Sequence, residues 1–461
     1  MKSPLLPILL LSIASSLQAQ PQRKPTVTLY EGARLILGTG AAPIESSAFI
    51  VENDRFTSVG RKGELRLPSG AARVDLTGKT VIPAMVDVHS HLGFLKQLDG
   101  SMSKANFNRE NLLDHLQRYA YHGFAGVISV GTDMGELPYQ LREEVDPGAA
   151  LFRTVGRGLA WPGSGPFDPA RNDVPYVVTT VEEARRAVQD LAPHHPDFVK
   201  IWVDDRNHTQ KKLTPELYTA AIDEAHKHNL RTIAHVFDLE DAKGLTRAGV
   251  EGFMHLVRDK DVDDDFLQLL RAHPGMFVTP NLGVTSRALE SGRPAWLDDP
   301  LLHETIPPGE IKRLETQFSN RKPEQLASTR ASWDRQVRNL AKMRAAGVRV
   351  VLGSDSAGDP SRTIGWHAIW EVDALGKAGM TPSEVIVAST RLAAETLRMD
   401  QLGTVAPGKS ADFVVLNANP LDDIANTRKI FKVYLRGQEV DRARMRAKWE
   451  SEWRSAAPPQ R

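Results

Sequence analysis

The sequence predicts an α/β protein in which a TIM-like (β/α)8 barrel is joined to a small β-sandwich domain formed by both chain ends. Three observations indicate this fold. Short strand patterns lie near each end of the 461-residue chain, apolar runs of strand length alternate with amphipathic helical stretches between them, and polar residues suited to metal binding follow those runs. Alternation of strands and helices sustained over a whole large domain is typical of a parallel barrel.

The first residues are expected to direct export and then to be removed. Lys2 is followed by the apolar segment 5–14 and by small residues before a cleavage site after Ala19, which is the pattern of a signal peptide. The apolar segment is shorter than the roughly 20 residues needed to span a bilayer, so cleavage is favoured over a stable membrane anchor. We therefore expect residues 1–19 to be a signal peptide and the mature protein to be periplasmic or secreted.

Composition excludes several classes of function. Lys and Arg number 58 against 57 Asp and Glu, so no nucleic-acid partner is expected. The chain has no cysteine, which excludes disulfide scaffolds, thiolate metal sites and cysteine nucleophiles. Any metal must therefore be held by nitrogen and oxygen ligands. The expected partner is a small-molecule substrate, and formation of a homo-oligomer stays open.

Residues 20–82 and 401–440 are expected to form the two parts of the β-sandwich domain, because both contain short alternating strands broken by turn residues. The predicted strands are 26–29, 34–37, 48–52, 56–59, 413–416 and 433–435. The first four predict a small antiparallel sheet. Residues 441–461 are expected to form a helical tail. There Trp449 and Trp453 would pack against the body, with a membrane or partner contact as the alternative.

Residues 83–400 are expected to form the barrel, since their apolar runs alternate with helical patterns. The predicted strands are 86–91, 127–130, 151–155, 198–203, 232–236, 252–255, 276–278 and 348–352.

Residues that can bind metal lie at the ends of five of these strands. His89 and His91, two positions apart, project from the same side of one strand. Such a pair alone is weak support for a site, but the spacing of the other candidates fits repeating strand–helix units. The candidates are His89 and His91 on strand one, Lys200 on four, His235 on five, His255 on six and Asp355 on eight. Because active sites of such barrels gather at the carboxyl ends of the strands, we expect one metal site. Isolated, locally paired polar residues are the alternative.

The order His-x-His, Lys, His, His, Asp resembles that of the amidohydrolase superfamily, and more narrowly its imidazolonepropionase and Xaa-Pro dipeptidase-like branch. The flanking sequences carry the same resemblance. Residues 38–44 and 81–91 are similar to the passage from the β domain into strand one, and residues 402–413 are similar to the return to that domain.

The resemblance implies two divalent ions bridged by a carboxylated Lys200. His89, His91 and Asp355 would bind one ion, and His235 and His255 would bind the other. A bridging anion offsets the repulsion between two dications. Zinc suits these nitrogen and carboxylate ligands best, and iron, manganese or cobalt would also fit. An ordinary Lys200 beside a single metal ion is the alternative.

Such a site predicts a metal-dependent amidohydrolase that cleaves an amide C–N bond. A metal-bridging hydroxide would attack a carbonyl polarised by the second ion. Asp355 and His255 are the candidate catalytic residues, and Asp355 would carry the proton to the departing nitrogen unless it is a ligand only. A dipeptide or N-acyl amino acid is the favoured substrate, followed by a cyclic amide, lactam or lactone. A ring deaminase and a catalytically inactive exported barrel are less favoured.

Substrate contacts are expected in the loops that follow the strands, where an arginine would bind a substrate carboxylate. The candidates are Trp161, Trp202, Arg206, Arg258 and Asn281. Residues 285–333 are long for a strand-to-helix connection and are predicted to form a lid. His367 and Glu371 lie one helical turn apart, which favours a pair on a helix surface over the alternative that both face the pocket.

Overall fold

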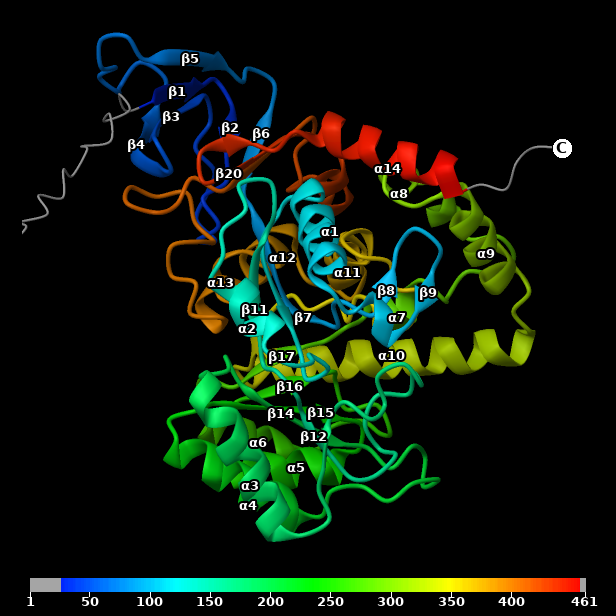
Figure 1. The fold of residues 1–461 in the computed structure, drawn as a ribbon. Helices are drawn as coiled ribbons and strands as arrows, with labels where there is room; N and C mark the ends of the chain where they lie inside the picture. The colour runs from blue at the N-terminus through cyan, green and yellow to red at the C-terminus, as the bar shows by residue number, and fades with distance from the viewer. Residues whose placement is uncertain (1–25, 457–461) are drawn as a thin grey trace, which may run out of the picture.

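The computed structural model describes residues 26–456 of the chain (Figure 1). The signal peptide predicted for residues 1–19 lies outside the described residues, as do the last five residues of the predicted tail. Within the described part of the chain, no helix is long and apolar enough to cross a membrane.

The middle of the chain supplies the predicted run of parallel strands, with one additional strand, β12, that the sequence does not predict. They are β7 (Met85–Ser90), β10 (Phe124–Ser129), β11 (Leu151–Thr154), β12 (Leu159–Ala160), β14 (Val199–Val203), β15 (Thr232–Val236), β16 (Gly252–Met254), β17 (Phe277–Thr279) and β18 (Arg349–Val350). Nearly all their residues are buried. Parallel strands are covered on both faces, which explains why their sequences are almost continuously apolar.

Hydrogen bonds connect these strands in sequence order. β7 pairs with β10 and β10 with β11, while β12 pairs with β14 and the pairing continues through β15, β16 and β17 to β18. The chain bends between β11 and β12 at Gly156, whose φ of 66° suits glycine. Further backbone bonds run from Gly158 N to Gly131 O and from Val88 N to Leu352 O, each 2.9 Å long. The segment after the last strand therefore lies beside the first strand.

Helices follow the strands, and sequence signals set their ends. α3 begins after Thr180, which forms a capping box with Glu183, and α5 ends at Gly249, whose φ is 93°. The helices are α1 (Arg109–Tyr121), α2 (Leu137–Arg142), α3 (Val181–Leu191), α4 (Pro215–Lys227), α5 (Leu239–Ala248), α6 (Asp264–Ala272), α7 (Gly283–Ser286), α8 (Pro300–His303), α9 (Pro308–Ser319), α10 (Pro323–Ala345), α11 (Trp366–Lys377), α12 (Pro382–Ser389), α13 (Arg391–Thr396) and α14 (Arg442–Ala456). In Figure 1, α3 to α6 cover the side of the molecule formed by β14, β15 and β16.

Two further sheets lie together at one end of the molecule and contain strands from both chain ends (Figure 1). The first has the order β4-β3-β1-β5, with β4 (Arg55–Arg61), β3 (Ser47–Glu52), β1 (Val27–Glu31) and β5 (Ala72–Asp75). The second has the order β2-β6-β19-β20-β21, with β2 (Arg34–Leu35), β6 (Thr80–Pro83), β19 (Phe413–Leu416), β20 (Ile430–Leu435) and β21 (Gln438–Glu439).

The prediction that the first four strands form one antiparallel sheet is wrong. β2 lies in the second sheet, parallel to β6, and the unpredicted strand β5 pairs in parallel with β1. The chain changes sheets over the two residues between β1 and β2. A strand as short as β2 contains too little alternation to indicate which sheet it joins.

Aromatic side chains from both sheets share one hydrophobic cluster. Tyr30, Phe49 and Phe56 come from the first sheet, and Phe413 and Tyr434 come from the second. The centroids of contacting rings lie between 4.5 and 5.8 Å apart. Burial of these rings holds the two ends of the chain together.

The segment 285–333, predicted as a lid, instead packs on the body of the molecule. Its Trp296 is buried, and the Trp296 ring lies 5.1 Å from that of Trp366 and 6.1 Å from that of Trp370 on α11. A segment fixed by a buried tryptophan does not suit a lid that opens to solvent.

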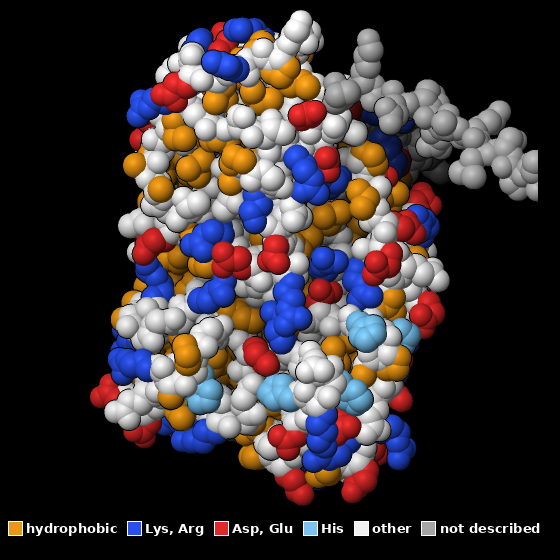
Figure 2. All heavy atoms as spheres, turned by 90° about the vertical axis from the view of Figure 1, so that its left-hand side faces the viewer, with side chains coloured by type: hydrophobic (Ala, Val, Ile, Leu, Met, Phe, Trp, Pro, Cys, Tyr) orange, Lys and Arg blue, Asp and Glu red, His pale blue; other side chains and the backbone are white. Residues whose placement is uncertain are grey.

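The surface shown in Figure 2 has Lys, Arg, Asp and Glu side chains intermixed over the whole face. This agrees with the near balance of charge in the sequence.

The C-terminal helix α14 packs on α1 through Trp449, as the sequence predicts. The Trp449 side chain is fully buried, and its Nε1 donates a hydrogen bond of 2.7 Å to Asp114. The Arg118 guanidinium lies 4.3 Å from the ring centroid, within range of a cation–π interaction. Trp453 is only half-buried.

We predict that Trp449→Ala lowers the free energy of unfolding by about 3 kcal/mol, because a large buried ring and its hydrogen bond are lost together. The matched variant Trp453→Ala should cost much less, since that ring is already partly in water. Urea unfolding followed by circular dichroism measures both. Equal losses in the two variants would contradict the packing role of Trp449.

Candidate metal centre

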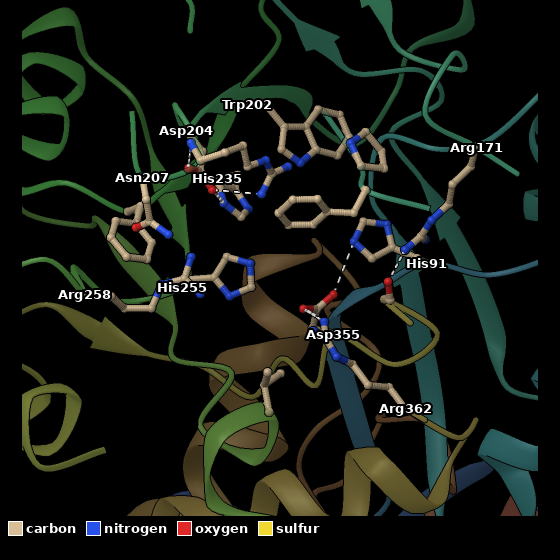
Figure 3. A pocket seen from close by; sticks show the side chains of 16 residues that line it. His91, Arg171, Trp202, Asp204, Asn207, His235, His255, Arg258, Asp355 and Arg362 are labelled. Carbon is tan, nitrogen blue, oxygen red and sulfur yellow. Dashed lines mark hydrogen bonds and ion pairs between the residues drawn. The ribbon is translucent and has the colours of Figure 1, made fainter. Parts of the chain in front are cut away.

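The parallel strands and the segments that follow them bring the predicted metal-binding residues together, and Figure 3 shows four of these residues, His91, His235, His255 and Asp355. His89 lies on β7 and His91 directly after it, Lys200 on β14, and His235 on β15, while His255 follows β16 and Asp355 follows β18. The rings of His91, His89, His255 and His235 form a continuous row, in which neighbouring centroids are 5.4, 5.1 and 4.7 Å apart.

His89, His91 and Asp355 form a buried group that could hold one metal ion. Asp355 Oδ1 is 3.3 Å from His91 Nε2 and 3.8 Å from His89 Nε2. On the other side of the His89 ring, Nδ1 donates to Asn281 Oδ1 at 3.1 Å, and Asn281 in turn donates to Gly353 O. These bonds fix the His89 tautomer, which leaves the Nε2 lone pair free to face Asp355.

His235 is oriented in the opposite sense. Its Nε2 donates to Asp204 Oδ2 at 2.9 Å, so Nδ1 is the nitrogen left to bind an ion. A carboxylate behind an imidazole is a common support for a metal ligand, because it fixes the ring and increases its basicity. His255 lies next to this ring.

Lys200 lies among these groups with a fully buried side chain. Its Nζ is 5.1 Å from the centroid of the Trp202 ring and has no hydrogen-bond partner among residues 26–456. Burial lowers the pKa of Lys200 to about 7, because an ammonium loses its hydration there. A large share of Lys200 is therefore the neutral amine near pH 7, which is the form that reacts with carbon dioxide to give a carbamate.

Burial also lowers the pKa of each histidine in the row. The pKa of His91 falls to about 4 and that of His235 to about 3, while those of His89 and His255 lie well below the ordinary value. Burial opposes ionisation of Asp355, but Arg362, His91 and His89 outweigh this and hold its pKa well below the usual range. The site thus presents neutral imidazoles and an ionised carboxylate, which are the forms that bind metal.

Three residues of the candidate metal centre have a strained backbone. Asn281, His255 and Asp355 have positive φ values of 53°, 86° and 58°, in a region that residues other than glycine rarely adopt. Such strain is retained where the surrounding structure needs a side chain in one direction.

These residues fit a divalent metal site. The buried His89 Nε2 and Lys200 Nζ both lack a hydrogen-bond partner among the described residues, and a buried polar atom without a partner is costly unless something binds it. The donors are nitrogen and oxygen, as zinc and similar ions require.

A cavity of about 200 Å³ opens over the centre (Figure 3). Charged side chains and aromatic rings share its wall, which suits a polar substrate with an apolar portion. Besides His91, His235, His255 and Asp355, its lining residues include Phe167, Arg171, Trp202, Asp204, Arg206, Phe237, Arg258 and Arg362.

Comparison with known proteins assigns the chain to a family. A sequence model described as "Amidohydrolase family" matches residues 80–440. This chain belongs to the amidohydrolase family. As a member it is an enzyme, a hydrolase acting on C–N bonds, in a family that is generally metal-dependent, and the resemblance seen in the sequence is confirmed.

Individual relatives of this amidohydrolase are distant but cover most of its length. An imidazolonepropionase from Streptomyces avermitilis is 24% identical over 407 residues, 82% of this chain and 83% of the relative. A solved Xaa-Pro dipeptidase with methionine bound in its active site has a TM-score of 0.68 at 21% identity, covering 90% and 99% of the two chains. Ochratoxinase from A. niger also has a TM-score of 0.68, at 19% identity, covering 90% and 96%. These structures indicate a TIM-like barrel of mixed α/β content.

Three of the five residues predicted to contact substrate in this amidohydrolase line the cavity, and two do not. Trp202, Arg206 and Arg258 line the cavity. Trp161 does not, because its ring turns toward Lys211, and Asn281 is buried behind His89, where it orients that ring instead of facing substrate.

The surface location predicted for His367 and Glu371 is wrong. Both side chains are fully buried, and Glu371 accepts hydrogen bonds from the backbone of Leu282 and Gly283. Their helix α11 packs against Trp296 of the 285–333 segment and against α7 and α12, and residues 366–375 of α11 are all buried.

The sequence did not indicate Asp204, Arg171 or Arg362 as part of the site. Asp204 follows β14 directly, so its position at a strand end was a usable signal. Arg171 and Arg362 come from irregular loops, where no periodicity marks a residue that points inward.

We predict that Asp204→Asn weakens metal binding by about 10- to 100-fold, because the carboxylate that orients His235 is lost. Titration of the metal-loaded protein with a chelator measures the change. Asp205→Asn is the matched control, since Asp205 lies on the same loop but pairs with Lys212 and His208. If Asp204→Asn and Asp205→Asn hold metal equally well, Asp204 does not support the metal site.

Proposed function

We propose that this amidohydrolase cleaves the amide C–N bond of a dipeptide or an N-acyl amino acid. The observation that carries the proposal is the buried group of His89, His91 and Asp355, which the row of histidine rings extends to His255 and His235, with His89 Nε2 and Lys200 Nζ lacking a partner among residues 26–456. Membership of the family supports hydrolysis, and similarity to the Xaa-Pro dipeptidase structure supports an amide of an amino acid.

The resident cofactor in this proposal is a pair of divalent ions, with zinc favoured. His89, His91 and Asp355 would hold one ion, and His235 and His255 the other, with carboxylated Lys200 between them. When bound, the ions would activate a water molecule and polarise the scissile carbonyl. The burial of Lys200 and its lowered pKa support carboxylation, since a carbamate forms only from the free base.

Asp355 would move the proton in this reaction. Arg362 forms an ion pair with Asp355 and keeps it ionised, which is the form that can accept a proton from the attacking water. Asp355 would then deliver this proton to the departing nitrogen. His255 contributes as a neighbouring ligand rather than as a second proton carrier.

A cyclic amide, lactam or lactone is the second candidate substrate, favoured by the imidazolonepropionase relatives from Streptomyces. Deamination of a ring and an inactive exported barrel remain less favoured, since all six ligand positions are filled.

The proposal extends to location and organisation. Residues 1–19 would direct export to the periplasm or the medium, and the substrate would be met there. Residues 83–400 would form a closed (β/α)8 barrel, supported by the strand pairing. Residues 20–82 and 401–440 would form a β-sandwich, supported by their shared aromatic cluster, and 441–461 would form the helical tail.

We predict about two metal ions per chain in protein reconstituted with zinc and bicarbonate, as a two-metal site requires. Lys200→Met should retain one ion or none, because the bridging ligand is lost. Elemental analysis by mass spectrometry measures the content, and Lys211→Met, at an exposed lysine nearby, is the control. Two tightly held ions in Lys200→Met would show that Lys200 is not a ligand.

We also predict turnover on at least one member of a panel of dipeptides, N-acyl amino acids, lactams and lactones. Asp355→Asn should lower kcat by about 100-fold or more on that compound, since general acid–base transfer is removed. Release of the amine or acid, followed by chromatography, measures the rate. Failure of the whole panel with fully metal-loaded enzyme would contradict the proposed activity.

A further inference from the structure

The cavity over the metal centre contains more positive than negative side chains. Arg171, Arg206, Arg258 and Arg362 line it, whereas the carboxylates on its wall are Asp204 and Asp355 (Figure 3). Metal ions would add further positive charge. A substrate that fills this cavity is therefore expected to carry negative charge.

Two of the four arginines are already neutralised. Arg206 Nη1 lies 2.9 Å from Asp204 Oδ2, and Arg206 also donates to the backbone carbonyl of Gly165. Arg362 forms ion pairs with Asp355 and with Asp359, the latter at 2.7 Å. Neither guanidinium needs a charge from the substrate.

The other two have no carboxylate partner within the described residues. Arg171 is 2% exposed, and among residues 26–456 its only side-chain hydrogen bond runs from Nη2 to Gly358 O, while Nε and Nη1 are buried without a partner there. Arg258 makes one long bond of 3.4 Å to Val236 O, and its Nε is also buried without a partner.

Burial lowers the pKa of Arg171 and of Arg258 to about 10, so both remain charged near neutral pH. A buried, unpaired cation costs free energy, and a carboxylate that pairs with it in two parallel hydrogen bonds removes that cost.

The two unpaired arginines lie on opposite sides of the metal-binding residues (Figure 3). Arg171 approaches from the segment after β12 and bonds to Gly358, close to His91 and Asp355. Arg258 follows β16, three residues after His255, and lies near His235. A bond positioned over the metal centre would thus have one unpaired cation at each end.

We propose that the substrate carries two carboxylates, one on each side of the scissile amide, and that Arg171 and Arg258 bind one each. Asp355 delivers the proton to the leaving nitrogen, so the amine half lies toward Asp355 and its carboxylate meets Arg171. The carboxylate of the acyl half meets Arg258. This inference rests on the proposed amide hydrolysis and narrows its substrate class to small N-acyl amino acids with an acidic acyl group.

The size of the cavity agrees with such a compact substrate. Its volume of about 200 Å³ lies below the roughly 300–1,000 Å³ of typical small-molecule sites. A short dicarboxylic acyl group on one amino acid is preferable here to a longer peptide.

Four amides that differ only in charge test the proposal. N-succinyl-alanine has both carboxylates, N-butyryl-alanine lacks the acyl-side carboxylate, N-succinyl-ethylamine lacks the amine-side carboxylate, and N-butyryl-ethylamine lacks both. On metal-loaded full-length enzyme, we expect kcat/KM to fall about tenfold or more for each carboxylate removed, as for loss of a hydrogen bond to a charged group.

Variants assign each carboxylate to its arginine. Arg171→Gln should remove the preference for alanine over ethylamine and leave the preference for succinyl over butyryl. Arg258→Gln should do the reverse. Arg157→Gln is the matched control, because Arg157 donates to Val174 O in the segment that carries Arg171 but is stacked on Tyr176 outside the cavity, so a general loosening of that segment would show in both variants.

Several outcomes would overturn the inference. Equal cleavage of succinyl and butyryl amides would show that the enzyme does not recognise a carboxylate on the acyl half. The proposed amide hydrolysis would still hold. Equal losses on all four compounds in Arg171→Gln would mean that Arg171 positions Asp355 instead of binding substrate. Cleavage of other panel amides but of none of these four would exclude the dicarboxylate class. Inactivity on every amide tested would instead count against the proposed function itself.

Discussion

One buried carboxylate connects the first and last strand segments that supply the metal centre. Asp87, on β7, accepts hydrogen bonds from the backbone of Ser354 at 2.9 Å and from the hydroxyl of Tyr119 at 2.8 Å, as well as from the Ser354 hydroxyl and the backbone of His89. It thereby ties the strand that bears the first two histidines to the segment that bears Asp355. Burial raises the pKa of Asp87 to about 6, and only this full set of donors makes a carboxylate tolerable there. Together with direct backbone bonds such as Asp355 N to His89 O at 2.7 Å and His91 N to Ser356 O at 2.9 Å, this carboxylate fixes the ligands from the first and last strands relative to each other.

Burial of the polar ligands costs free energy when the protein folds, but it also keeps these ligands in the forms that bind metal. Desolvation keeps the four imidazoles unprotonated and shifts Lys200 toward its neutral amine. Second-layer partners then decide which nitrogen is free, since Asn281 fixes His89 from one side and Asp204 fixes His235 from the other. An ion that occupies the centre supplies the missing partners, so metal binding and stability of the folded enzyme are coupled.

The sequence predicts the buried strands and the polar ligands associated with them. It does not predict features that depend on how the loops fold. Except for β12, the parallel strands are predicted to within a few residues, because strands covered on both faces give continuous apolar runs, and the candidate ligands are recognisable as polar residues within or directly after those runs. β2 is predicted in the wrong sheet, because a strand of two residues is too short for its side-chain alternation to show which sheet it joins. His367 and Glu371 were misplaced because their spacing describes one helix, whereas their burial comes from a distant segment that carries Trp296. Arg171 was missed because nothing local distinguishes an inward-pointing loop arginine from a solvated one.

Close packing between strand ends explains how the environment of Lys200 is maintained. Trp202 lies on the same strand as Lys200, lines the cavity, and covers the Lys200 amine. Room for this ring exists because two neighbouring positions are glycine. A Cβ at Gly131 would lie 2.5 Å from the Trp202 ring and 2.8 Å from Lys200 Cγ, and a Cβ at Gly158 would lie 2.2 Å from the ring. Either side chain would push Trp202 away and admit water to Lys200, which would restore its ammonium form. The chemistry of the centre therefore depends on two positions that carry no functional group.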